Sequence, residues 1–261
     1  MPIREDPGAP PGGRLLTDDD GRLVARFLEA FREGRRFADL LEPVEGASNQ
    51  VLVGAALANL RGWGVASPPE LARELMAAGA RPARHAHVMR RSLAGAVPAA
   101  WQQATFPGIA IGPLDCAPAA IAPAMLSAHP PDHPDFEPGE DKLPNVVTRL
   151  ERLIDGHDAG PVLPCSRVAV DANGSVRGAA IITEILRREP PMGGPWLAEL
   201  YREPGWSGLG AALLRAPLWQ AAADGHPAIG LAVTEANAAR GLYEATGFEL
   251  VSSWLNVDLP D

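Results

Sequence analysis

Two runs of β-forming residues joined by a tight turn restrict the fold of this chain more than any other feature. They read "RVAV" and "VRGAAIITEI", and Asp-Ala-Asn-Gly at 171–174 joins them. Asn-Gly between two such runs is the strongest short-range signal for a β-hairpin. A third β-forming run, "PWLAELYR", follows at 195–202. These residues therefore predict a sheet in the second half of the chain.

Helices and strands alternate around this hairpin. Before it, the pattern predicts a strand at 108–115 and helices at 118–128 and 146–155. After it, the pattern predicts a helix from the glycine-bearing "GWSGLGAALL" to about 223, a strand "PAIGLAVT", a helix over 238–246 and a last strand "ELVSSWLNVDL". Asn237 is a good N-cap for the last helix, and Gly247 can end it. The order from 108 is thus β-α-α-β-β-β-α-β-α-β, which is typical of an α/β fold.

The first hundred residues have a different pattern. Residues 1–14 are polar and rich in Pro and Gly, which predicts a disordered leader. Residues 15–105 predict a smaller, mainly helical N-terminal subdomain. Its helices are expected over 23–31, where Leu23, Val24, Phe27, Leu28 and Phe31 have helical spacing, over about 49–61, and over 68–78. A strand, "RHAHVMRRSL", follows at 84–93.

Charge and composition exclude several classes of function. The net charge of the 261 residues is −9, which argues against binding of nucleic acid and is compatible with a cationic substrate such as an amine. The N-terminus has no apolar segment typical of a signal peptide, and no apolar run approaches the length of a membrane span. The two cysteines form no pair motif, so a reducing compartment is expected. The chain is therefore predicted to be cytoplasmic, with no membrane partner.

Two groups of histidines could suggest a metal site. His85 and His87 would share one face of a strand, but a third ligand is not apparent in the sequence. The loop at 129–145 also carries histidines and acids, namely His129, Asp132, His133 and Asp135, but its prolines leave no regular scaffold for ligands. We interpret the first group as half-exposed strand residues and the second as a solvated loop. No metal is predicted.

A glycine-rich turn between a strand and a helix is the first candidate binding site. Gly205, Gly208 and Gly210 have the spacing G-x-x-G-x-G. Glycines let backbone amides approach a ligand closely, and amides at a helix N-terminus bind phosphate oxygens. The turn does not match the dinucleotide-binding fingerprint, because Leu213 stands where the third glycine of that motif would be. It does not match the Walker phosphate-binding motif either, because the lysine of that motif is absent.

The region from 108 to 261 resembles the GNAT superfamily of acyl-CoA-dependent N-acyltransferases. In that family an R/Q-x-x-G-x-G/A turn after the fourth strand holds the coenzyme A pyrophosphate, and here this turn falls on residues 205–210. The later family pattern of Asn, Ala, Leu-Tyr and Gly-Phe matches Asn237, Ala239, Leu242, Tyr243, Gly247 and Phe248. The resemblance implies a mixed central sheet with flanking helices.

The resemblance also implies which residues bind acetyl-CoA as co-substrate. The pantetheine arm would lie along the strand edge at 200–202, and the pyrophosphate would lie on the glycine turn. The implied cofactor-binding residues are Leu200, Tyr201, Arg202, Gly205, Trp206, Ser207, Gly208, Leu209, Gly210, Ala211, Asn237, Ala239 and Tyr243.

The sequence departs from the family in two places. Gly205 replaces the Arg or Gln that opens the turn, which removes a side-chain contact but leaves the amides. Asn237 precedes Tyr243 by six residues, where seven is commoner. The first hundred residues lie outside the match, and two alternatives stay open for them: a degenerate second GNAT half, in a tandem arrangement, or an unrelated helical cap.

The resemblance assigns the acid to Tyr243, and the position of Glu199 on the central strand, where side chains can reach the acceptor side, suggests the base. Acyl transfer from a thioester to an amine needs a neutral nucleophile, stabilisation of an oxyanion and a proton for the thiolate. Tyr243 stands where the family's Tyr supplies that proton, since a phenol of pKa about 10 suits a thiolate of similar basicity. A backbone amide of the strand at 198–202 would stabilise the oxyanion. Glu199 is the first candidate for the general base, and Glu184, Glu235 or a chain of waters are alternatives.

The expected function is N-acetyl transfer from acetyl-CoA to a primary amine of a small molecule or peptide. The alternative is a non-catalytic acyl-CoA-binding or regulatory module with the same fold. Thioester hydrolysis is less favoured, because no Ser-His-Asp set or activated Cys is visible in the sequence. Formation of a homodimer is compatible with the sequence.

Overall fold

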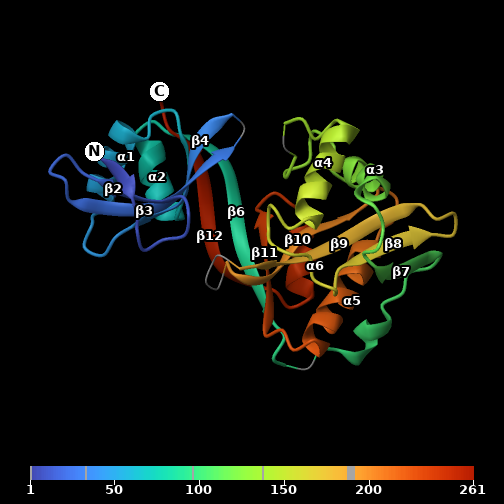
Figure 1. Cartoon of the computed structure of the whole chain (residues 1–261). Coiled ribbons are helices and arrows are strands. Elements are labelled where there is room, and N and C mark those ends of the chain that lie inside the picture. Colours follow the sequence, from blue (N-terminus) through green and yellow to red (C-terminus); the bar gives the residue numbers. More distant parts are fainter. Residues whose placement is uncertain (1, 33, 96, 137, 187–191) are drawn as a thin grey trace. The chain divides into compact units, whose positions relative to one another are not determined.

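The computed structural model describes residues 2–32, 34–95, 97–136, 138–186 and 192–261 (Figure 1). The chain divides into two compact units. The first unit consists of Met1–His87 and Ser252–Asp261, and the second unit consists of Val88–Val251. In the described part of the chain, no helix is both long and apolar enough to cross a membrane.

The first unit is a sheet covered by two helices. Its elements are β1 (Ile3–Glu5), β2 (Gly13–Thr17), β3 (Leu23–Arg32), β4 (Arg35–Pro43), α1 (Asn49–Asn59), β5 (Gly64–Ser67), α2 (Pro69–Ala77) and the first part of β6 (Arg81–Ser92). Strands β1 to β4 are antiparallel neighbours, and β5 runs parallel to β4. The last part of β12 (Glu249–Asp258) completes this sheet by pairing antiparallel with β5.

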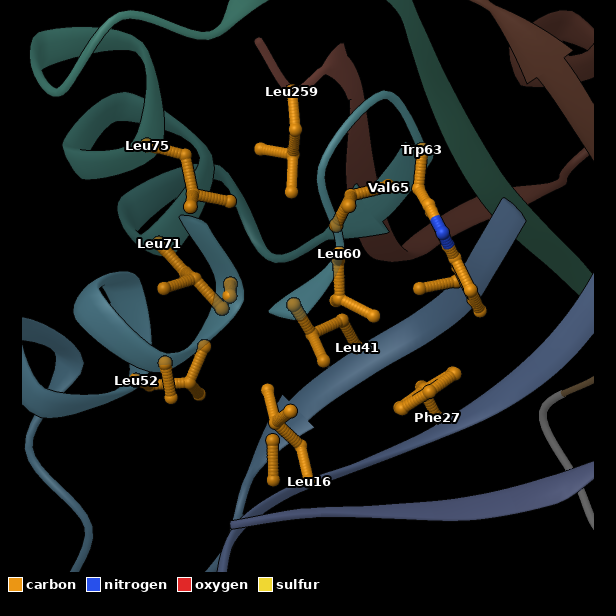
Figure 2. Close-up of a cluster of buried hydrophobic side chains, with 14 of the residues drawn as sticks. Leu16, Phe27, Leu41, Leu52, Leu60, Trp63, Val65, Leu71, Leu75 and Leu259 are labelled. Atoms are coloured by element: carbon orange, nitrogen blue, oxygen red, sulfur yellow. The ribbon is translucent and has the colours of Figure 1, made fainter. Parts of the chain in front are cut away.

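The core of the first unit lies between the sheet and the helices (Figure 2). Leu16 and Leu41 come from the strands, and Leu52 and Leu71 come from the two helices; all are at most 1% exposed. Trp63 belongs to the same core. Burial of apolar side chains, which are drawn from every layer of the unit, is what holds the helices on the sheet.

The prediction of a disordered leader and a mainly helical first subdomain is wrong. Residues 3–5 form β1, and residues 23–32 form β3 in place of a helix; Met1 lies outside the described residues. The register between β2 and β3 shifts between Leu16 and Thr17, which leaves Val24 as an extra residue on β3. A bulge puts successive side chains on one face. Val24 and Ala25 are accordingly both buried, and the apolar spacing resembles that of a helix.

The second unit places its sheet between two helical layers. Its elements are the end of β6, the 3-10 helix η1 (Ala99–Gln103), β7 (Ile109–Pro113), α3 (Pro118–Ala128), α4 (Leu143–Ile154), β8 (Arg167–Asp171), β9 (Val176–Ile185), β10 (Gly194–Arg202), α5 (Leu209–Ala223), β11 (Ala228–Thr234), α6 (Ala239–Ala245) and the start of β12. The strand order is β6-β11-β10-β9-β8-β7, in which β7 to β10 are antiparallel and β10 and β11 are parallel. Residues of α3 and α4 share one core with the sheet, and residues of α5 and α6 share another. The helices and strands predicted from 108 onward are confirmed.

The two units have the same order of elements. The series β2-β3-β4-α1-β5-α2-β6 of the first unit is matched by β8-β9-β10-α5-β11-α6-β12 of the second. The last strand of each series ends in the other unit: the end of β6 belongs to the second unit, and the end of β12 belongs to the first. The boundary predicted near residue 106 therefore differs from the structure. A cut there would remove Met89 and Leu93, which are buried in the core of the second unit.

Because the C-terminal residues complete the first unit, a core residue beyond β12 should be essential for its stability. Leu259 is 3% exposed in the first core, whereas Leu250 in β12 is 52% exposed. We expect Leu259→Ala to lower the free energy of unfolding by about 2–5 kcal/mol. The control Leu250→Ala should change it by less than about 0.5 kcal/mol. Urea unfolding followed by circular dichroism measures both, and equal effects would contradict the strand exchange.

Candidate active site

A β-bulge on β10 decides which way Glu199 faces. Leu197 pairs with Ile182 and Glu199 pairs with Ile181, so Ala198 is an extra residue on β10. Leu197 packs in the core shared with α5. Strict alternation along a strand would return Glu199 to that same face. The bulge turns Glu199 to the opposite face, where its carboxylate contacts Arg149 of α4.

The backbone edge of β10 loses its strand partner just before this bulge. β10 and β11 pair at Trp196 and Gly230, and no further backbone ladder joins these two strands in the described part of the chain. Two parallel strands that separate leave amides and carbonyls that an extended ligand can use. The predicted pantetheine-binding residues, 200–202, lie on β10 beyond the point of separation.

The glycine turn leads from the end of β10 into α5. Gly205 and Gly208 have φ values of 89° and 88°, in the left-handed region that favours glycine, and Gly208 is the N-cap of α5. Within the described residues, the amides of Gly208 and Gly210 have no acceptor among the backbone hydrogen bonds of the turn. Phe106 and Trp206 lie beside it, with ring centroids 6.2 Å apart. Free amides at a helix N-terminus fit an anion such as a pyrophosphate.

Charged side chains next to this turn are arranged in one network. Arg177 contacts Asp171 at 2.7 Å and Glu203 at 2.5 Å, and its guanidinium lies 5.7 Å from the centre of the Trp206 ring. Arg202 donates to the carbonyl of Glu203 at 3.1 Å. These contacts fix the strand end that precedes the turn.

Tyr243 lies on α6 and is 6% exposed. Its ring packs edge-on to Phe248, with centroids 5.8 Å apart. Burial first, and then the charges of Asp135 and Glu199, raise the pKa of Tyr243, so its phenol remains protonated at neutral pH. The helix ends as the sequence predicts, since Gly247 has a φ of 86° and the amide of Phe248 donates to the carbonyl of Tyr243 at 3.0 Å.

Asn237 links the start of α6 to a distant loop. Its Oδ1 accepts from the amide of Ala239 at 2.8 Å, which satisfies a free helical amide, although the N-cap residue itself is Ala238. Its Nδ2 donates to Asp135 at 2.5 Å, and the hydroxyl of Thr234 donates to the other oxygen of that carboxylate. Asp135 therefore joins the loop between α3 and α4 to the end of β11.

That loop is more than the solvated segment that its prolines predict. It places His129 with its ring 6.1 Å from Tyr201 and 4.7 Å from His133. Burial, helped by the charges of His133 and Arg149, lowers the pKa of His129 to about 4. His129 is therefore neutral at pH 7. The sequence offers no signal for the contact between His129 and Tyr201, because these residues lie far apart along the chain.

The sequence did not indicate two charged residues that act with Glu199, namely Arg149 and Glu140. Arg149 of α4 contacts both Glu199 and Glu140, whose side chains are 10% and 11% exposed. Of the other candidates for a general base, Glu235 is exposed and contacts Arg240 at 2.6 Å. Glu184 lies on β9 opposite Pro195, near the far end of β10. Of the three candidate bases, Glu199 is the one whose charge raises the pKa of Tyr243, after burial and the charge of Asp135.

The histidines of the first unit have a local role. The rings of His85 and His87 lie 4.5 Å apart on β6. His87 is buried, and its Nδ1 shares a 2.8 Å hydrogen bond with the hydroxyl of Ser253 on β12. This contact joins the two strands within the first unit.

Comparison with known proteins relates this architecture to one group of folds. No family model and no curated protein matches the sequence. Among solved structures, the GCN5-related N-acetyltransferase from Sphaerobacter thermophilus matches with a TM-score of 0.63 and 16% identity, over 94% of this chain and 79% of that one. A tandem GNAT protein from the clavulanic acid biosynthesis pathway matches with a TM-score of 0.57 and 17% identity, over 95% and 83%.

A third match extends over nearly the whole chain. The GCN5-related N-acetyltransferase from Kribbella flavida covers 99% of this chain and 90% of its own, with a TM-score of 0.51 and 16% identity. At these identities the likeness concerns the fold. The chain therefore has the fold of the GNAT superfamily over most of its length, as the glycine turn and the Asn-to-Phe pattern predict.

Proposed function

We propose that this protein is an N-acetyltransferase that moves an acetyl group from acetyl-CoA to a primary amine by direct attack. The observation that carries the proposal is the separation of β10 from β11 beside the glycine turn. Glu199 lies on the separating strand, and its charge acts on the buried phenol of Tyr243. One site would then combine a free strand edge, free amides, a base and an acid.

The residues around the turn fit coenzyme A. The amides of Gly208 and Gly210 would hold the pyrophosphate, and the backbone of 200–202 would pair with the pantetheine arm. A Cβ at Gly208 would meet only Phe106, at 3.6 Å, so the space over this backbone is otherwise open within the described residues. The amides at the N-terminus of α5 also place the positive end of the helix dipole toward the phosphates.

Each proton has a carrier in the proposed reaction. Glu199 accepts a proton from the acceptor ammonium, and the neutral amine attacks the thioester carbonyl. A backbone amide of β10 near the bulge donates to the oxyanion. When the carbon–sulfur bond breaks, Tyr243 gives its proton to the departing thiolate, and the phenolate takes up the second proton that the attacking nitrogen loses as it becomes an amide. His129 is a poor candidate for the base, because a pKa of about 4 makes its ring weakly basic.

We place this chemistry in the second unit alone. In the first unit α2 ends like α6, because the amide of Ala80 donates to the carbonyl of Leu75 at 3.0 Å, as Phe248 does to Tyr243. Leu75 therefore stands where the second unit has its phenol. Phe37 of β4 pairs with Gly64 of β5 as Trp196 of β10 pairs with Gly230 of β11, so Leu40 stands where the second unit has Glu199. Apolar residues thus occupy both corresponding positions, which supports the interpretation of the first unit as a degenerate half.

The glycine turn can be tested with a pair of variants. Gly208→Ala adds a methyl group over the free amides, and we expect it to weaken acetyl-CoA binding at least tenfold, about 1.4 kcal/mol. Gly225→Ala is the control, because Gly225 at the other end of α5 also has a positive φ (83°) and open space around it. Calorimetric titration measures both affinities. Equal affinities for the two variants would exclude the turn as the pyrophosphate site.

Tyr243→Phe tests the acid. It keeps the ring and its packing on Phe248 while it removes the hydroxyl, so acetyl-CoA affinity should change little and stability by at most about 1 kcal/mol. Turnover of an accepted amine should fall roughly 10²-fold, mainly in kcat. Release of free thiol measures the rate. A wild-type kcat in this variant would show that Tyr243 is a packed aromatic residue and not the acid.

Glu199→Gln tests the base. Near neutral pH we expect kcat/KM to fall by about 10²-fold. The difference in kcat/KM between variant and wild type should shrink as the pH approaches the pKa of the amine, because a larger fraction of the acceptor is then already deprotonated in solution. Glu151→Gln, an exposed residue on α4, makes the same change in net charge and should leave the rate unchanged. A deficit that is constant with pH would exclude Glu199 as the base.

A further inference from the structure

Two arginines of the second unit lie against one tryptophan ring. The guanidinium carbon of Arg91, on β6, lies 4.8 Å from the centre of the Trp101 ring, and that of Arg215, on α5, lies 5.9 Å from it. Both distances are within the range of a cation–π interaction. Trp101 belongs to η1, which packs against α5. Three separate elements therefore bring two positive charges to the same ring.

These two guanidinium groups are not paired with acids in the part of the chain that the structure describes. No carboxylate among those residues forms an ion pair with Arg91 or Arg215, and neither side chain makes a hydrogen bond to them. The Nε of Arg91 is buried, and burial lowers the pKa of this guanidinium. Two like charges beside one ring repel each other, and an anion that binds both removes the repulsion. The arrangement therefore fits a binding site for an anion.

Helix α5 connects this arginine pair to the glycine turn. Arg215 follows Gly208 by seven residues, so the two lie on one side of α5, about 10 Å apart along its axis. Side chains of a helix lean toward its N-terminus, which brings Arg215 back toward the turn. The segment before β7 follows the same side of the helix, because Trp101 faces Arg215 and Phe106 would lie 3.6 Å from a Cβ on Gly208.

Helix α6 connects Arg91 to the same turn. A side chain on Gly247, at the end of α6, would collide with Nη1 of Arg91, so this glycine makes room for the guanidinium. In the middle of α6, Leu242 would lie 3.6 Å from a Cβ on Gly210. α6 thus contacts the glycine turn through its middle and Arg91 through its end. Both arginines are therefore near the turn but outside it.

We propose that Arg91 and Arg215, packed on Trp101, bind the 3′-phosphate of coenzyme A. This inference rests on the proposed function. The 3′-phosphate is a phosphate monoester that carries about two negative charges at pH 7. One ribose joins it to the pyrophosphate, so a pyrophosphate on the glycine turn would leave the 3′-phosphate nearby. Guanidinium groups bind phosphate oxygens through paired N–H donors, which makes arginine suited to this ligand.

Two forms of the coenzyme isolate this phosphate. Acetyl-CoA and acetyl-3′-dephospho-CoA differ only in the 3′-phosphate. We expect calorimetric titration of the wild-type full chain to give at least about tenfold tighter binding of acetyl-CoA, because hydrogen bonds between charged groups are the strong ones. Equal affinities for the two forms would overturn the proposal.

Single variants assign the preference to residues. Arg91→Gln and Arg215→Gln should each reduce the preference for acetyl-CoA at least about threefold and leave the affinity for the dephospho form unchanged. Arg215 is exposed, so its variant should fold even if replacement of the partly buried Arg91 lowers stability. Arg73→Gln, at an exposed position of α2 in the first unit, removes the same charge and should retain the full preference. A full preference in Arg215→Gln, or an equal loss of affinity for both ligands, would overturn the assignment.

Adenosine nucleotides distinguish this proposal from the proposed function. Adenosine 3′,5′-bisphosphate has the 3′-phosphate and adenosine 5′-monophosphate lacks it, and neither has a thioester. Tighter binding of the bisphosphate, lost in Arg215→Gln, by a protein that releases no thiol from acetyl-CoA with a panel of primary amines would retain the phosphate site and exclude acetyl transfer. Thiol release with equal kcat/KM from acetyl-CoA and its dephospho form would retain acetyl transfer and exclude the phosphate site.

Discussion

The separation of β10 from β11 is the constraint on which the site depends. Two strands that pair at Trp196 and Gly230 and then diverge leave one backbone edge of β10 without a strand partner among the residues that the structure describes. The bulge at Ala198 adds the second requirement, since it turns Glu199 away from the α5 core and toward α4. A regular strand would have buried the carboxylate among leucines, where a charge is costly. The irregularity thus provides both the free edge and the orientation of the proposed base.

The loop between α3 and α4 completes the site by long-range polar contacts. Asp135 binds Thr234 and Asn237, and Glu140 shares Arg149 with Glu199. These contacts connect one helical layer to the ends of two strands. Because the side chains are largely buried, each hydrogen bond or ion pair positions its partner more firmly than the same contact would at the surface.

The repeated order of elements explains why the first unit exists without a second set of functional residues. A shared topology needs only the same pattern of strands, helices and a helix-ending glycine, and both units have it. Chemistry needs particular side chains, and Leu75 and Leu40 fill the two positions where the second unit has Tyr243 and Glu199. The exchanged ends of β6 and β12 make each unit depend on the other for a strand, so neither half is complete alone.

The sequence by itself determined what depends on neighbouring residues. The hairpin at 171–174, the glycine turn, the helix that ends at Gly247 and the position of Tyr243 all follow from local conformational preferences, and the structure agrees with them. The prediction of a helix at the start of the chain was wrong, because residues 23–32 form a strand in which a bulge produces the apolar spacing of a helix. Only the tertiary structure decided the exchanged strands, the face of Glu199 and the joining of Asp135 to Asn237. These depend on strand pairing and on contacts between residues about a hundred positions apart, which a local pattern does not encode.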